Sequence, residues 1–208
     1  MNQILQTKKN NKSFSIYYNI IFFISIILIF SLAIYLFFTS LTLKKNENYS
    51  KQILENYNIT RLYSNNEKIS YSKKSLDNDE ISIIGIIEIP KLSIQYPIFS
   101  NYEENLLKIS PCRFFGPFPG KKGNLCIAGH NYDNNKFFSK INTLNIGDDI
   151  IIYNNNQKRF TYTISKIYEV KENDLSPIYN YNKDIKQLTL FTCNNLNKNR
   201  IIVKASIF

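Results

Sequence analysis

The sequence predicts a mainly β domain behind an N-terminal transmembrane helix. Three observations support this fold class: an uncharged apolar run near the N-terminus, a series of short β segments from residue 81 onward, and little helical periodicity after that point. Residues 81–208 hold seven or eight short strands, which is typical of a closed or nearly closed β-barrel or of a sandwich.

The apolar run predicts an uncleaved membrane anchor. No charged residue occurs from Ser13 to Leu43, and the 19 residues Ile20–Phe38 are almost wholly apolar. As a helix they would span about 28 Å, the thickness of a hydrocarbon core. A signal peptide has a shorter apolar region of about 7–15 residues and a small-residue cleavage site, which this run lacks. We therefore predict a cytoplasmic N-terminus at 1–15 and an anchor at 16–43.

The flanks of the anchor predict its orientation. Three lysines precede it and Lys44 and Lys45 follow it, so the basic flanks nearly cancel. Long domains cross a membrane largely regardless of their charge. We therefore expect an extracellular stalk at 44–80, helical near Tyr49–Tyr57 and otherwise loosely ordered, and an extracellular catalytic domain at 81–208. The cell membrane is the predicted location, and the lipid bilayer is a predicted partner of the helix.

The charge of the outer part argues against a nucleic-acid partner. The chain has a net charge of +10, and residues 46–208 hold 21 basic and 16 acidic side chains. This excess is modest, and no dense stripe of lysine and arginine accompanies it. We predict no binding of nucleic acid.

The predicted strands follow one another with turn signals between them. Two helical segments are also predicted, at Glu103–Ile109 and Lys136–Ile146. The strand segments are Ile81–Pro90, Lys91–Phe99, Gly123–Gly129, a hairpin within Asp148–Val170, residues 186–192 and residues 200–208.

Three residues at predicted strand ends form a candidate catalytic group. His130 follows one strand, Cys193 ends another, and Arg200 begins the next. A cysteine thiolate is a nucleophile, a histidine can protonate a leaving amine, and an arginine can stabilise an oxyanion. Taken singly, each has an ordinary reading: a loop histidine, a buried thiol and a solvated arginine.

Together these residues resemble the sortases, the membrane-anchored cysteine transpeptidases of Gram-positive surfaces. The resemblance runs in order through residues 81–208. It rests on the segments "GIIEIPKLSIQYPIF", "GNLCIAGHN", "FFSKINTLNIGDDIIIY", "TLFTC" and "RIIVKA". The segment "TLFTC" fits the family's TLxTC active-site motif, and the short segments around Cys193 look most like a class D or class A-like member.

The resemblance implies a closed eight-stranded β-barrel with one or two short helices. It further implies that Cys193 cleaves an LPxTG-like sorting signal of secreted proteins through a thioacyl intermediate. An amine acceptor from a cell-wall precursor then resolves this intermediate. By the same resemblance, His130 acts as general acid and then base, Arg200 stabilises the substrate carbonyl and oxyanion, and Thr192 helps to position the substrate.

Two other functions use the same sequence features. A membrane-tethered cysteine peptidase would pass the thioacyl group to water instead of an amine. A catalytically silent extracellular binding module would leave Cys193, His130 and Arg200 scattered or buried.

The remaining cysteines and acids suggest no cofactor. Cys112 and Cys126 allow a disulfide outside the membrane, but two buried thiols are the favoured reading. Some sortases bind calcium. The acids that match such a site by position only are Glu103, Glu104, Glu172 and Asp174. We predict neither a metal nor another cofactor.

Overall fold

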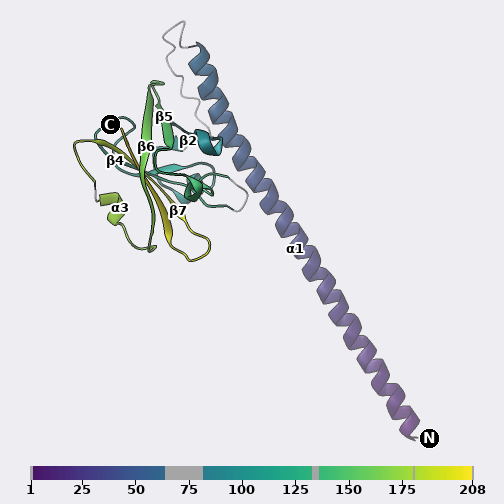
Figure 1. Ribbon diagram of the computed structural model, residues 1–208. Coiled ribbons are helices and arrows are strands. Elements are labelled where there is room, and N and C mark those ends of the chain that lie inside the picture. The colour runs from purple at the N-terminus through teal and green to yellow at the C-terminus, as the bar shows by residue number, and fades with distance from the viewer. Residues whose placement is uncertain (1, 64–81, 133–135, 180, 208) are drawn as a thin grey trace. The chain divides into compact units, whose positions relative to one another are not determined.

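The computed structural model describes residues 2–63, 82–132, 136–179 and 181–207 (Figure 1). Contacts within the chain group it into two compact units, Met1–Lys45 and Asn46–Phe208. Residues 64–80 of the predicted stalk and the start of the first predicted strand at Ile81 lie outside the described residues.

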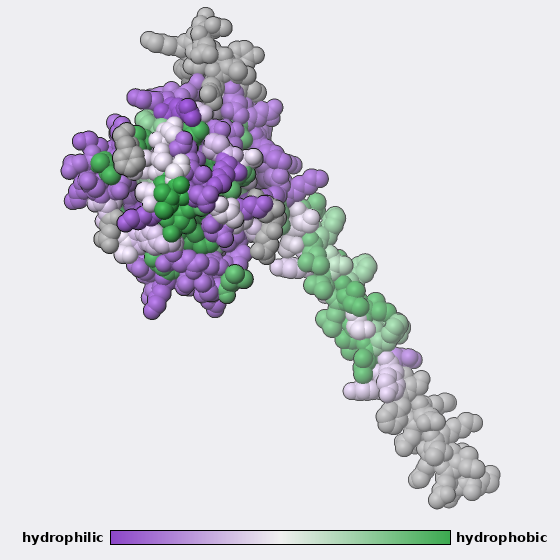
Figure 2. All heavy atoms as spheres, in the orientation of Figure 1, coloured by the Kyte–Doolittle hydropathy of each residue, from purple (hydrophilic) through white to green (hydrophobic). Residues whose placement is uncertain are grey.

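The first unit consists of helix. Helix α1 runs from Asn2 to Tyr63, so it also continues into the second unit. Its segment Tyr17–Asn58 contains an 18-residue window of mean hydropathy 2.9, none of which is buried. Figure 2 shows apolar side chains gathered along this helix. By length and composition the helix can cross a membrane, in agreement with the predicted anchor.

The second unit is built on a closed barrel, which confirms the predicted fold class and excludes the sandwich. The strands follow the order β1-β2-β3-β4-β7-β8-β6-β5 around the barrel. The pairs β2–β3 and β4–β7 are parallel and the others are antiparallel. The strands are β1 (Ile83–Ile89), β2 (Ile94–Phe99), β3 (Cys112–Phe115), β4 (Gly123–Ala128), β5 (Asp149–Asn154), β6 (Arg159–Val170), β7 (Lys186–Cys193) and β8 (Arg200–Ile207).

Among the described residues, four short helical segments connect the strands. They are η1 (Pro90–Leu92), α2 (Glu104–Leu107), η2 (Ile141–Thr143) and α3 (Ser176–Tyr179). The helix predicted at Glu103–Ile109 is confirmed in shorter form as α2, whereas α3 was not predicted.

Alternating side chains fill the barrel interior. On β7, Leu188 and Leu190 are fully buried in the central apolar cluster, and Val203 on β8 joins them. Because successive side chains of a strand point to opposite faces, the residues between them face outward. Burying one such side chain contributes about 1.5–3 kcal/mol, so this cluster fixes which residues face out.

The end of α1 packs as part of the second unit. Tyr49 and Ile53 contact the apolar cluster on the outside of the barrel, and Tyr57 is buried against Ile86 and Tyr153. These α1 residues recur every four positions and therefore lie on one helix face. The helix is longer than the segment 49–57 that was expected to be helical, because it continues to Tyr63.

The helix predicted at Lys136–Ile146 is wrong. The structure has only the short η2 in this segment, because Phe137 adopts a left-handed backbone with φ of 51° and bridges to Asn131. The apolar spacing reflects burial instead: Phe138 and Ile141 lie in the central cluster. Strand β3 was also missed, since its four residues are too few to show alternation.

Cys112 and Cys126 are buried free thiols on neighbouring strands. In the β3–β4 pairing, Cys112 lies opposite Ala128 and Cys126 lies opposite Phe115. Burial raises the pKa of Cys112 to about 12 and that of Cys126 to about 11. Both thiols therefore remain protonated and unreactive at neutral pH.

Candidate active site

Cys193 and Arg200 lie directly opposite each other where β7 ends and β8 begins. They are paired in the antiparallel register of these strands. Asn194 N–H donates to the carbonyl oxygen of Asn199 at 2.7 Å, closing the six-residue loop between them. Side chains opposite each other in such a pair are about 5 Å apart at Cβ. The two predicted site residues are therefore neighbours.

His130 lies beside the end of β7. It follows β4, which pairs with β7 in parallel up to Ala128 and Phe191. Two hydrogen bonds continue the contact past the paired strands. The Thr192 hydroxyl donates to the carbonyl oxygen of Gly129 at 2.6 Å, and Asn131 Nδ2 donates to that of Cys193 at 2.7 Å. His130 stands between these two bonds, next to Cys193.

The three residues form one row, which we call the site row, on the outside of the barrel. Leu190 faces the interior, so Cys193 faces outward three positions later; Val203 faces the interior, so Arg200 does the same. Cys193 is exposed, whereas His130 and Arg200 are half-buried. The row gives an accessible thiol flanked by an imidazole and a guanidinium, and it contradicts the arrangement expected of a silent module.

Two nitrogens of the site row have no hydrogen-bond partner among the residues that the structure describes. They are Nε2 of His130 and Nε of Arg200, and both are buried. The Arg200 guanidinium carbon lies 5.9 Å from the ring centre of Phe191, within the range of a cation–π contact. Buried polar atoms without partners are costly in a folded protein, and these two are available to a bound substrate.

Burial lowers the pKa of His130 below its ordinary value. Of two smaller influences from α2 and its end, Glu104 raises this pKa and Lys108 lowers it. The ring of Tyr132 covers the imidazole, with centroids 4.9 Å apart. The neutral form of His130 is therefore favoured, and a protonated His130 readily gives up its proton.

Thr192 faces away from the site row. Its side chain is buried, and its hydroxyl is engaged with the Gly129 carbonyl oxygen. This bond fixes the residue before His130 against the residue before Cys193. The predicted part of Thr192 in substrate binding stays a prediction.

Three further residues shape the site without having been predicted. Asn131 donates to the Cys193 carbonyl oxygen, and the ring of Tyr132 packs against the imidazole of His130. Their position next to His130 in the sequence was the one signal that could have indicated them. Glu169 on β6 accepts hydrogen bonds from three asparagine side chains of the loop after Cys193, at residues 194, 197 and 199. These bonds lower the pKa of Glu169. No sequence pattern indicated that Glu169 would hold this loop.

No metal site is visible in the part of the chain that the structure describes: no three His, Cys, Asp or Glu side chains lie close enough together to hold an ion. Of the acids considered for calcium, Asp174 accepts a hydrogen bond from the Ser176 backbone N–H at 2.8 Å.

Comparison with known proteins decides the family. The family profile of the Sortase domain matches residues 87–208, which include the whole site row. The chain belongs to the sortase family. Sortases are cysteine transpeptidases.

Individual sortases resemble this chain to different extents. Sortase A of Bacillus anthracis is 32% identical over 123 residues, which cover 58% of this chain and 57% of that protein. The match thus spans little more than half the length of this curated relative. Sortase A of Staphylococcus aureus is 26% identical over 79% of this chain and 78% of its own.

Among solved structures, a Clostridium perfringens sortase D5 transpeptidase superposes with a TM-score of 0.60 at 30% identity. The match covers 79% of this chain and 99% of that one. Sortase A of Corynebacterium diphtheriae, with a TM-score of 0.56 at 20% identity, shares the fold.

Proposed function

We propose that this sortase cleaves an LPxTG-like sorting signal and transfers the resulting acyl group to an amine of a cell-wall precursor. The observation that carries the proposal is the site row, in which exposed Cys193 has Arg200 opposite it and His130 beside it. The likeness to the sortase D5 transpeptidase supports membership of class D.

The proposed reaction has two halves. Cys193 gives its proton to His130, and the thiolate attacks the Thr–Gly carbonyl carbon of the signal. Arg200 donates to the oxyanion of the tetrahedral intermediate. The C–N bond then breaks, His130 returns the proton to the leaving amine, and a thioester remains on Cys193.

In the second half, an acceptor amine attacks the thioester carbon. His130, now neutral, takes a proton from this amine, and its lowered pKa lets it pass that proton on. The C–S bond breaks, and His130 gives this proton to the departing Cys193 sulfur, which restores the thiol and the neutral imidazole. A new amide joins the surface protein to the acceptor.

The anchor gives the proposal its place in the cell. We infer that α1 spans the cell membrane with the N-terminus in the cytoplasm, so that the catalytic domain lies on the extracellular face. Secreted substrates and wall precursors meet there.

Steady-state cleavage of an LPxTG-type peptide tests the assignment. Cys193→Ala should abolish turnover, and Arg200→Ala should lower kcat/KM by about 10²–10³, the usual effect of removing an oxyanion donor. Cys126→Ala, which removes a buried thiol outside the site row, is the control and should retain turnover. Comparable rates in all variants would contradict the assigned roles. Release of the peptide acid alone, with an amine present, would favour a hydrolase.

A further inference from the structure

The outer sheet face that carries the site row also carries two lysines placed opposite each other. Lys166 on β6 pairs in register with Lys204 on β8. Like charges directly opposite on neighbouring strands destabilise a sheet. Within the described residues, neither lysine forms an ion pair with an acidic side chain. No carboxylate among the described residues therefore neutralises either side chain, and burial lowers the pKa of Lys204.

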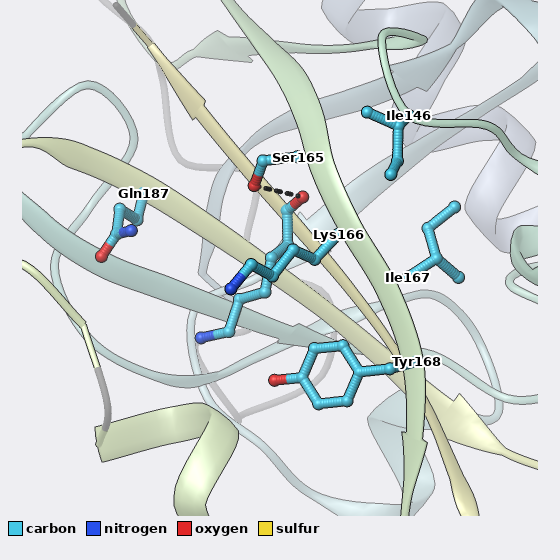
Figure 3. A pocket seen from close by; sticks show the side chains of 7 residues that line it. Ile146, Ser165, Lys166, Ile167, Tyr168 and Gln187 are labelled. Atoms are coloured by element: carbon cyan, nitrogen blue, oxygen red, sulfur yellow. Dashed lines mark hydrogen bonds between the residues drawn. The ribbon is translucent and has the colours of Figure 1, made fainter.

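The two lysines line a pocket of about 590 Å³ on β6, β7 and β8. Ser165, Tyr168 and Gln187 also line it, together with the apolar side chains of Ile146 and Ile167. Figure 3 shows Lys166 and Tyr168 extending their polar ends from β6 toward the side on which Gln187 lies. The pocket thus combines two lysine side chains and several neutral polar groups with an apolar wall.

Local hydrogen bonds orient the groups of this pocket as donors. The Gln187 side-chain oxygen accepts from Asn182 N–H at 2.9 Å, which leaves the amide N–H groups for another acceptor. Lys204 Nζ donates to the carbonyl oxygen of Pro177 and retains two further N–H groups. Burial raises the pKa of Tyr168, so its hydroxyl stays protonated. The side chains of Lys166, Lys204, Gln187 and Tyr168 can therefore each donate a hydrogen bond to a ligand.

We propose that this pocket binds a phosphate or phosphate-ester group between Lys166 and Lys204, with Gln187 and Tyr168 as additional donors. Lysine is a common phosphate ligand and binds this anion as a compact point charge, whereas the fork of arginine matches both carboxylate and phosphate. The pocket has lysines and no arginine. Several donors on separate strands suit a tetrahedral anion with several oxygens.

The pocket is separate from the site row. Lys204 follows Arg200 by four residues, which is about 13 Å along a strand. Ile202 and Phe191 occupy the sheet face between them, and Phe191 is buried there. A phosphate in the pocket would not touch Cys193, so the site can be tested independently of peptide cleavage.

Equilibrium dialysis of radiolabelled inorganic phosphate against the full chain in nonionic micelles, at constant ionic strength, tests the proposal. We expect saturable binding to the wild type. Lys166→Gln/Lys204→Gln should weaken it by about tenfold or more, as expected for losing charged hydrogen-bond donors. The control Lys121→Gln/Lys122→Gln removes the same charge from two exposed lysines outside the pocket and should bind as the wild type. The single variant Lys166→Gln changes an exposed side chain, so it keeps the test valid if the double variant misfolds. It should also bind phosphate more weakly than the wild type.

The outcomes separate a site from general charge attraction. No saturable binding to the wild type, or equal weakening in the pocket and control variants, would overturn the proposal. Competition distinguishes the sources of the phosphate. Displacement by soluble glycerol phosphate would indicate a free phosphate ester, and displacement only by phosphatidylglycerol incorporated into the micelles would indicate a lipid headgroup.

Discussion

The hydroxyl of Thr192 joins the two segments that carry the nucleophile and the histidine. It donates to the buried carbonyl oxygen of Gly129 at 2.6 Å, one residue before His130. The same position in the sequence is part of the "TLFTC" segment, where its neighbour Cys193 faces the opposite side of the strand. Thr192 therefore holds the ends of β4 and β7 together from the strand face opposite Cys193.

Thr192→Val should lower the free energy of unfolding by about 1–3 kcal/mol. Valine keeps the shape of threonine but leaves the Gly129 carbonyl oxygen buried without this donor. Thr192→Ser keeps the hydroxyl and should cost less. Denaturant unfolding of the full chain in nonionic micelles measures both variants, and equal values for Val and Ser would contradict the role of this bond.

His130 should make the protein less stable in mild acid. Burial lowers its folded pKa below the unfolded value of about 6.5. Below that pH the unfolded chain binds the proton more readily, so stability falls as pH falls toward the folded pKa. Carboxylates with lowered pKa values, such as Glu169, contribute only at more acidic pH. The melting temperature should therefore decrease from about pH 7.5 to about pH 5.5, and His130→Gln should flatten this decrease. An unchanged slope in the variant would contradict the burial of the imidazole.

At the scale of elements, the last described turns of α1 belong to the catalytic unit. Tyr57 is 5% exposed, and its hydroxyl donates to the carbonyl oxygen of Asn154 at 2.7 Å. Glu47 forms an ion pair with Lys136, six residues after His130. The helix thereby contacts both β5 and the segment that follows the histidine.

Tyr57→Ala should lower the stability of the full chain by about 3–5 kcal/mol, as for other buried aromatic residues. Tyr57→Phe removes only the hydroxyl and should cost about 1 kcal/mol. Glu55→Ala, at an exposed position of the same helix, is the control and should change stability by less than about 0.5 kcal/mol. Thermal unfolding measures all three. If Tyr57→Ala matched the control, α1 would not be part of the folded domain.

The sequence predicted the elements whose side chains alternate or whose turns are marked. Strand β7 shows Leu188 and Leu190 at alternate positions, and its end placed Cys193 at an edge of the barrel. The sequence could not predict that Phe137 would take a left-handed conformation, because its apolar neighbours have helical spacing. It also gave no sign that Glu169 anchors the loop after Cys193, since that contact depends on the pairing of β6 with β8.

At the scale of the whole molecule, the three cysteines differ in exposure, and this difference allows the orientation of the chain across the membrane to be measured. Cys193 is exposed, whereas Cys112 and Cys126 are buried with raised pKa values. A membrane-impermeant maleimide applied to intact cells should therefore add one label per chain, on Cys193, and none to Cys193→Ser. Labelling only after lysis would contradict the extracellular location of the domain. Labelling of the other cysteines would contradict their burial.

The most direct measurement of the central claim is the intact mass of the full chain mixed with an LPxTG-type peptide. The site row predicts an acyl adduct confined to Cys193, which disappears when triglycine is added and yields the peptide–triglycine amide. An adduct on another residue, or an unmodified Cys193 in a protein that still cleaves the peptide, would contradict the proposed thioacyl mechanism.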